Sequence, residues 1–143
     1  MEEDAGMKLI TWMTAAVVML AFNTSIGAAT QSESEMNQEA CGKYKKADVE
    51  LNRIYQQILR DNAADKNFIQ KMGSAQRAWM AFRDAHLNSI YPDPTPEAYG
   101  SVNPMCRCMI LERLTNDRIA MLSEWTDGIP EGDVCVGSQK IKR

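Results

Sequence analysis

The sequence has little of what an active site usually needs. It contains a single histidine, His86, and no Gly-x-Ser-x-Gly pattern, which marks one common class of serine nucleophile. His86 falls on the apolar side of a predicted helix, where a packed imidazole is more common than a general base. No pair of carboxylates stands out as a glycosidase-like acid and base. We therefore expect a protein that is not an enzyme and uses no cofactor.

Positive charge is also scarce. The chain carries 16 lysines and arginines against 19 aspartates and glutamates, a formal net charge of −3. Contacts between basic side chains and phosphates supply most of the non-specific affinity for nucleic acid. The sequence has no basic stripe to make these contacts, so we exclude nucleic acid as a partner. Glu124, Asp127, Glu131 and Asp133 occur within ten residues that contain no base. This run is typical of solvated surface; the alternative is that it attracts a basic partner.

No apolar run is long enough to span a bilayer comfortably. The run Leu9–Phe22 holds fourteen uncharged residues behind Lys8, the pattern of a secretory signal peptide. We predict a signal peptide over residues 1–29, cleaved after Ala29. Met7 is an alternative translation start, because acidic residues before it oppose the usual positive charge. No cysteine follows closely to accept a lipid, so we expect a soluble mature chain, free of the membrane and periplasmic or secreted.

Three helical patterns follow, at about residues 35–60, 65–91 and 103–127. Asp65 is suited to cap the second helix and Asn103 to cap the third, and the prolines after the second helix forbid its continuation. No strand pattern or repeat competes with this interpretation. The sequence predicts an all-α fold, an antiparallel three-helix bundle.

The predicted domain covers residues 30–127, and residues 128–143 form an irregular C-terminal extension. Apolar groups recur at spacings of three and four in each helix, so each helix buries one face. The buried stripe predicted for the second helix is Phe68, Met72, Ala75, Trp79, Phe82, His86 and Ile90, with Leu87 beside it.

Gln76, Trp79 and Arg83 lie along one edge of the second helix. We interpret Trp79 as core and Arg83, like Arg118, as paired with Glu50 or Asp84 in or beside the bundle, because a buried guanidinium needs a carboxylate. The alternative exposes Arg83 to a binding partner.

Four cysteines in an exported chain predict two disulfides. Cys106 and Cys108 point about 200° apart on a helix and cannot readily pair. Cys108 lies on the apolar stripe of the third helix and Cys41 borders that of the first, and both stand at the same end of an up-down-up bundle. We therefore favour Cys41–Cys108, which leaves Cys106–Cys135. That second bond requires the tail to return about 28 Å along the third helix as a disulfide-tethered strap.

A Cu(I) site is the alternative for these cysteines. The segment Met105–Met109 puts two thioethers and two thiols in five residues, and such soft ligands suit Cu(I). Methionines beside helical cysteines more often fill a core, so we predict no metal site and keep periplasmic Cu(I) binding as an alternative.

Three blocks in order carry a resemblance to a known family: residues 50–55 (Glu-Leu-Asn-Arg-Ile-Tyr), residues 76–84 (Gln-Arg-Ala-Trp-Met-Ala-Phe-Arg-Asp) and residues 114–118 (Leu-Thr-Asn-Asp-Arg). In this order they resemble the LprI-type lysozyme inhibitors, small exported bacterial proteins. The chain has His86-Leu87 where members usually carry a cysteine, and residues 131–135 resemble the end of one subgroup. The resemblance implies inhibition of lysozyme.

Inhibition by occlusion needs a rigid loop that enters the enzyme's cleft. The candidate is the loop of residues 92–103, because its prolines reduce the entropy lost on binding and Tyr99 offers a large anchor. Ser101 and Arg107 are placed to donate hydrogen bonds to carboxylates, and Arg83 is the candidate on the helix edge. The expected partner is lysozyme or another peptidoglycan-degrading enzyme, and the alternative is an immunity protein against a wall-degrading toxin.

Overall fold

The structure, a computed structural model, describes residues 25–142. It contains helix α2 (Ser25–Asp61), helix α3 (Lys66–Ile90), the short 3-10 helix η1 (Pro96–Tyr99) and helix α4 (Asn103–Thr126). The predicted all-α class is confirmed. The apolar run Leu9–Phe22 of the predicted signal peptide lies outside the described residues. None of the helices within 25–142 is long and apolar enough to cross a membrane.

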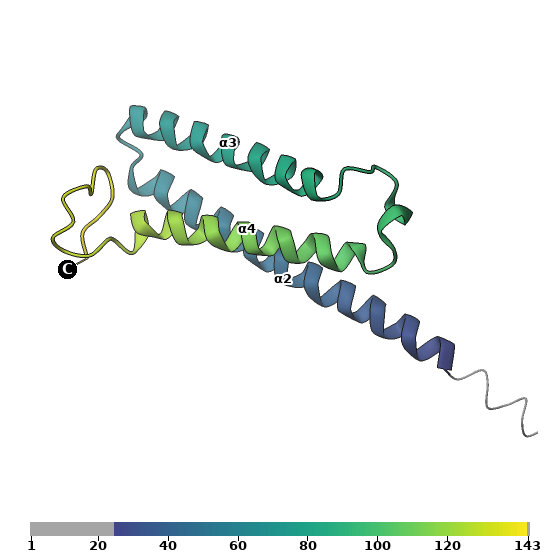
Figure 1. The fold of residues 1–143 in the computed structure, drawn as a ribbon. Helices are drawn as coiled ribbons and strands as arrows, with labels where there is room; N and C mark the ends of the chain where they lie inside the picture. The colour runs from purple at the N-terminus through teal and green to yellow at the C-terminus, as the bar shows by residue number, and fades with distance from the viewer. Residues whose placement is uncertain (1–24, 143) are drawn as a thin grey trace, which may run out of the picture. The chain divides into compact units, whose positions relative to one another are not determined.

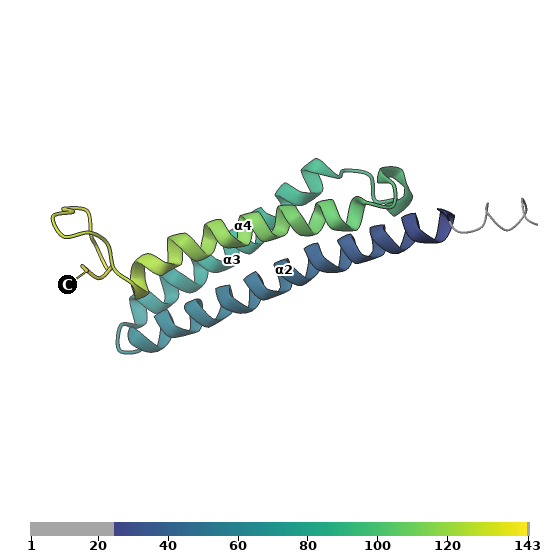
Figure 2. The same ribbon diagram turned by 90° about the horizontal axis from the view of Figure 1, so that it is seen from below.

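From Asn37 onward the chain forms one compact unit. Within it α3 runs back along α2, and α4 returns in the direction of α2, so successive helices alternate in direction as in an antiparallel bundle (Figures 1 and 2). The bundle core joins all three helices, because Leu51, Ile54 and Ile58 of α2 pack with Met72 of α3 and Leu122 of α4. Leu51, Ile54 and Ile58 are spaced three and four residues apart, so α2 buries one face as this spacing predicts.

Both ends of α3 follow local sequence signals. The Asp65 side chain caps α3 by accepting a hydrogen bond from the Phe68 backbone N–H at 2.9 Å, as predicted. Pro92 follows the last turn of α3, where we placed the stop. The first helix is longer than predicted, because α2 already begins at Ser25.

Helix α3 is rotated relative to the predicted stripe. Ala75 is exposed, as are Phe82 (55% exposed) and Ile90 (40% exposed). Met72 of the stripe and Leu87 beside it are buried as predicted, and Gln76, which was not predicted, is buried as well. The stripe was predicted from the spacing of mainly apolar residues, and it left out Gln76, whose amide oxygen accepts a hydrogen bond from Arg118 of α4.

One of the two predicted disulfides is present. Cys41 and Cys108 form a bond with an S–S distance of 2.00 Å and join α2 to α4, which confirms that pairing. Cys106 and Cys135 are free cysteines, so the second predicted bond is wrong. The two cysteines are at opposite ends of α4 and cannot bond. Cys106 lies in the first turn of this helix, while the tail that carries Cys135 stays near its last turn (Figure 1).

The C-terminal tail, residues 128–142, is held by hydrogen bonds and not by a disulfide strap. The Trp125 indole N–H donates to Ser138 Oγ at 3.1 Å, and Lys140 Nζ lies 3.0 Å from Asp61 Oδ2. Ile129 pairs with Ile141 in a single parallel bridge. Gly128 allows this closure, since its φ is 82° and an added Cβ would lie 3.0 Å from the Lys142 backbone nitrogen. The tail therefore folds on itself beside the last turn of α4.

Candidate functional site

The loop of residues 92–103 crosses from α3 to α4 and contains η1 (Figure 1). It precedes the first turns of α4, which the Cys41–Cys108 disulfide joins to α2. Most of its residues are exposed. The loop thus presents a surface on a covalently fixed end of the bundle.

Two tyrosines, Tyr91 just before the loop and Tyr99 within it, stiffen the loop. The rings of Tyr91 and Tyr99 meet edge to face with centroids 5.1 Å apart, and the Arg107 guanidinium lies over the Tyr91 ring at 5.2 Å. The Tyr99 hydroxyl oxygen accepts a hydrogen bond from the Asp93 backbone N–H at 2.6 Å. Tyr99, predicted as a free anchor, is therefore half-buried and already engaged within the loop.

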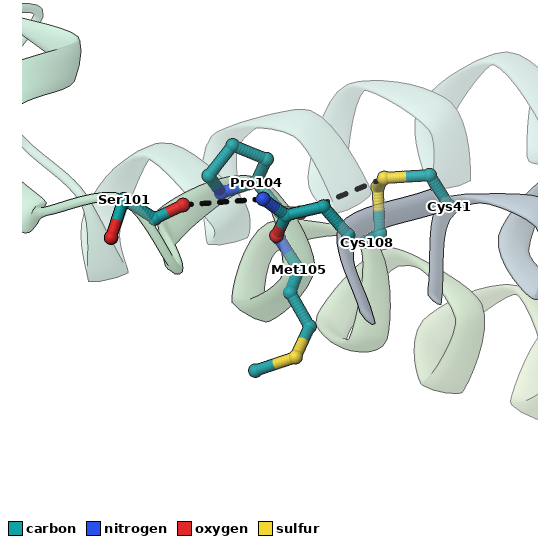
Figure 3. The surroundings of a disulfide bond; sticks show 6 residues. Cys41, Ser101, Pro104, Met105 and Cys108 are labelled. Carbon is teal, nitrogen blue, oxygen red and sulfur yellow. Dashed lines mark hydrogen bonds between the residues drawn. A yellow bond between two sulfur atoms is a disulfide. The ribbon is translucent and has the colours of Figure 1, made fainter. Parts of the chain in front are cut away.

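Asn37 of α2 ties the loop to the bundle. Its Nδ2 donates to the Ser101 carbonyl at 3.2 Å, and its Oδ1 accepts from the Met105 backbone N–H at 2.9 Å. Figure 3 shows Ser101 and Met105 next to the Cys41–Cys108 bond. Asn37 thus caps α4 from another helix, a role predicted for Asn103.

The amino end of α4 offers little to an anion. The backbone N–H of Asn103 donates to Gly100 O and that of Cys106 to Val102 O, Pro104 has no N–H, and Met105 is capped by Asn37. Cys41 Sγ lies 3.7 Å from Pro104 O, a contact only, because a disulfide sulfur carries no proton. The donors of this helix end are therefore already used.

Two neighbouring pockets flank the loop. One, of about 640 Å³, is lined by Tyr91, Tyr99 and Arg107 together with Asn88, Pro92, Asp93, Pro94, Asn103 and Pro104. The second, of about 380 Å³, is lined by Glu97, Gly100, Ser101, Asn103 and Pro104. The structure therefore brings three predicted residues, Tyr99, Ser101 and Arg107, to one surface.

The charges of this surface are largely uncompensated. Among residues 25–142, Arg107 forms no ion pair with a carboxylate. The Asp93 carboxylate accepts from the Thr95 backbone N–H at 2.8 Å, and this hydrogen bond lowers the pKa of Asp93. Partial burial raises the pKa of Tyr91, and the nearby Cys106 thiol adds to that rise. The surface thus offers one available cation, Arg107, beside the acidic side chains of Asp93 and Glu97.

Arg83 lies elsewhere, between α2 and α3. Its Nε lies 2.9 Å from Asp84 Oδ1 and its Nη1 lies 3.7 Å from Asp48 Oδ1, with the side chain 15% exposed. Its guanidinium also covers the Trp79 ring at 5.3 Å. Burial alone would lower the pKa of Arg83, but its hydrogen bond to Asp84 and the nearby charges raise it. This confirms the predicted pairing with Asp84 and leaves Arg83 outside the loop surface.

Arg83 does not use the alternative partner Glu50, and the predicted carboxylate partner of Arg118 is wrong. Glu50 pairs with Arg53 on its own helix and not with Arg83. Arg118 donates to the amide oxygen of buried Gln76 at 3.1 Å, and burial lowers the pKa of Arg118. The guanidinium of Arg118 thus donates to an amide oxygen where we expected a carboxylate.

Two residues of the site, Asn37 and Tyr91, are not among the predicted site residues. An aromatic directly before a proline loop, eight residues ahead of a second tyrosine, was a usable signal for Tyr91. No local pattern points to Asn37, because its partners lie 64 and 68 residues away.

The fold and the loop define a small disulfide-linked helical bundle that presents a fixed loop surface. The chain matches the family described as Lysozyme inhibitor LprI over residues 26–122, and it belongs to that family. That description is of inhibitors and not of enzymes. Comparisons with curated proteins and with solved structures found no match.

The described residues contain no cluster of three or more histidine, cysteine, aspartate or glutamate side chains suited to a metal ion. The Cu(I) alternative relied on thiols at both Cys106 and Cys108, and Cys108 is consumed by its bond to Cys41. The premise of that alternative is therefore not met.

Proposed function

We propose that the protein is exported and inhibits a lysozyme by placing the loop of residues 92–103 over the enzyme's substrate cleft. Membership of the LprI family carries the proposed activity. Export is supported by the predicted signal peptide and by the Cys41–Cys108 bond, since disulfides persist mainly in oxidising compartments such as the periplasm.

Preorganisation of the loop supports occlusion as the mechanism. A loop that is already ordered loses little conformational entropy when it binds. Here the internal bond from the Asp93 N–H to Tyr99 and the two hydrogen bonds of Asn37 fix the loop before any partner arrives. The exposed Ser101 side chain and the adjoining pockets remain on the outer surface.

Arg107 supplies the charge that the target requires. Glycoside hydrolysis uses a pair of carboxylates in the cleft, and an arginine donates strong, charge-assisted hydrogen bonds to a carboxylate. Because Arg107 has no carboxylate partner within the described chain, it is free to meet one on the enzyme. Stacking on Tyr91 holds its guanidinium in place.

The test replaces Arg107 by glutamate and measures inhibition constants against several lysozymes. We expect at least tenfold weaker inhibition, because a repelled interface charge costs several kcal/mol. Arg113→Glu is the matched control, as Arg113 is exposed on the same helix, and it should inhibit like the wild type. Equal inhibition by both variants would remove Arg107 from the mechanism, and a wild type that inhibits no lysozyme would refute the proposed activity.

A further inference from the structure

The outward face of α3 is poor in charge and carries a large exposed ring. We define the α3 outer face as the exposed residues from Ser74 to Asn88. Its centre consists of small side chains: Ala78, Ala81 and Ala85. Phe82 lies on one edge and is 55% exposed, and the charged residues on the other edge are Arg77 and Asp84.

Phe82 is held on the surface. The His86 ring stacks on it with centroids 5.6 Å apart and an interplanar angle of 23°. Its neighbours across the face are alanines, so a bulky ring stands beside a shallow surface. Phe82 and the alanines form one continuous apolar surface on α3, which makes this face a candidate interaction site.

We propose that the α3 outer face binds a second copy of this chain, with the two α3 helices antiparallel. Arg77 and Asp84 are seven residues apart and lie about 20° apart around the helix axis. A two-fold axis midway between them places Arg77 of each copy opposite Asp84 of the other. The face is therefore complementary to itself, as an isologous interface requires.

Both charged groups are available for this contact. Among the described residues Arg77 forms no ion pair, and its guanidinium donates only to Ser74 Oγ at 3.1 Å. Asp84 uses Oδ1 for Arg83, which leaves Oδ2 for a second donor.

The positions of the two edges select the antiparallel direction. At 100° per residue, Phe82 and the Arg77–Asp84 pair lie on opposite sides of Ala81 and Ala85. An antiparallel two-fold pair brings like edges together, charged edge to charged edge and Phe82 to Phe82. A parallel pair would press the charged edge of one copy onto the Phe82 edge of the other. The alanines between the edges allow the two backbones to approach closely.

The two charged positions permit a sharp test by sedimentation at low salt over a concentration series. The wild type should sediment as a dimer at high concentration. Arg77→Glu and Asp84→Lys should each self-associate roughly tenfold more weakly, because each creates two like-charge contacts. An equimolar mixture of the two variants should dimerise again, since each mixed pair regains two opposite-charge contacts.

Phe82→Ala tests the apolar edge and should also weaken dimerisation. Met109→Ala is its control, because Met109 is 54% exposed on α4, and it should behave like the wild type. A wild type that remains monomeric throughout the series overturns the proposal. So does a mixture that associates no better than its components, or a Phe82→Ala variant that dimerises as strongly as the wild type.

Discussion

At the scale of single residues, Asn37 joins the fold to the candidate site. Asn103 was predicted to cap α4, but it is the first residue of that helix and is buried, and its Oδ1 has no hydrogen-bond partner within the described chain. The cap comes from α2 instead. Capping patterns are local in sequence, so a cap supplied by another helix cannot be found from them.

Replacing Asn37 by alanine should lower the free energy of unfolding by about 1–2 kcal/mol. The Met105 N–H and the Ser101 carbonyl would both lose their partner. Chemical denaturation measures the effect. The control is Asn52→Ala, because the Asn52 amide bonds only to Asp48 one turn earlier on an exposed face, and it should change stability by less than about 0.5 kcal/mol. Equal effects in the two variants would show that the cap is not a stabilising contact.

At the scale of the elements, the sequence predicted the three helices and most of their ends but not the rotation of α3. Asp65 and Pro92 act on the backbone directly, so they can be recognised without the fold. The rotation depends on what the polar residues meet. Gln76 accepts a hydrogen bond from Arg118, and the Arg83 guanidinium covers the Trp79 ring. These contacts turn the edge of α3 that carries Gln76 and Arg83 toward the bundle, so Phe82 faces outward. Hydrophobic periodicity assigns polar residues to solvent and cannot anticipate such pairs.

Because α3 is rotated, Trp79 and Phe82 should contribute differently to stability, although the predicted stripe places both in the core. Trp79 packs against the core cluster, so Trp79→Ala should cost about 3 kcal/mol of stability. Phe82→Ala should cost less than about 1 kcal/mol, because its ring is 55% exposed. Urea denaturation at concentrations where the protein is monomeric measures both. Comparable losses would mean that Phe82 is buried and that the predicted stripe was correct.

At the scale of the whole molecule, the two ends of α4 are held in different ways. A disulfide links its first turns to α2, and hydrogen bonds hold the C-terminal tail near its last turn. Chain-length arithmetic permitted the tail to reach Cys106 but did not require it to do so. The contacts with Trp125 and Asp61 hold the tail beyond the end of α4. The Cys41–Cys108 bond therefore acts alone in linking the first turns of α4 to α2.

The two cysteine pairs should consequently differ in their effect on stability. Cys41 and Cys108 are separated by 67 residues, and closing a loop of that length stabilises a fold by roughly 2–4 kcal/mol, mainly by restricting the unfolded chain. Replacing both by serine should cost that much in denaturation experiments. Replacing both Cys106 and Cys135 by serine should change stability little, since both are free.

Thiol titration of the unfolded, unreduced protein provides the decisive count. We expect two thiols per chain, from Cys106 and Cys135. A count of none, together with a peptide linking Cys106 to Cys135, would instead restore the strap along α4. In that case the Cys106/Cys135 double variant would also lose stability, because a second loop would then be closed in the native protein.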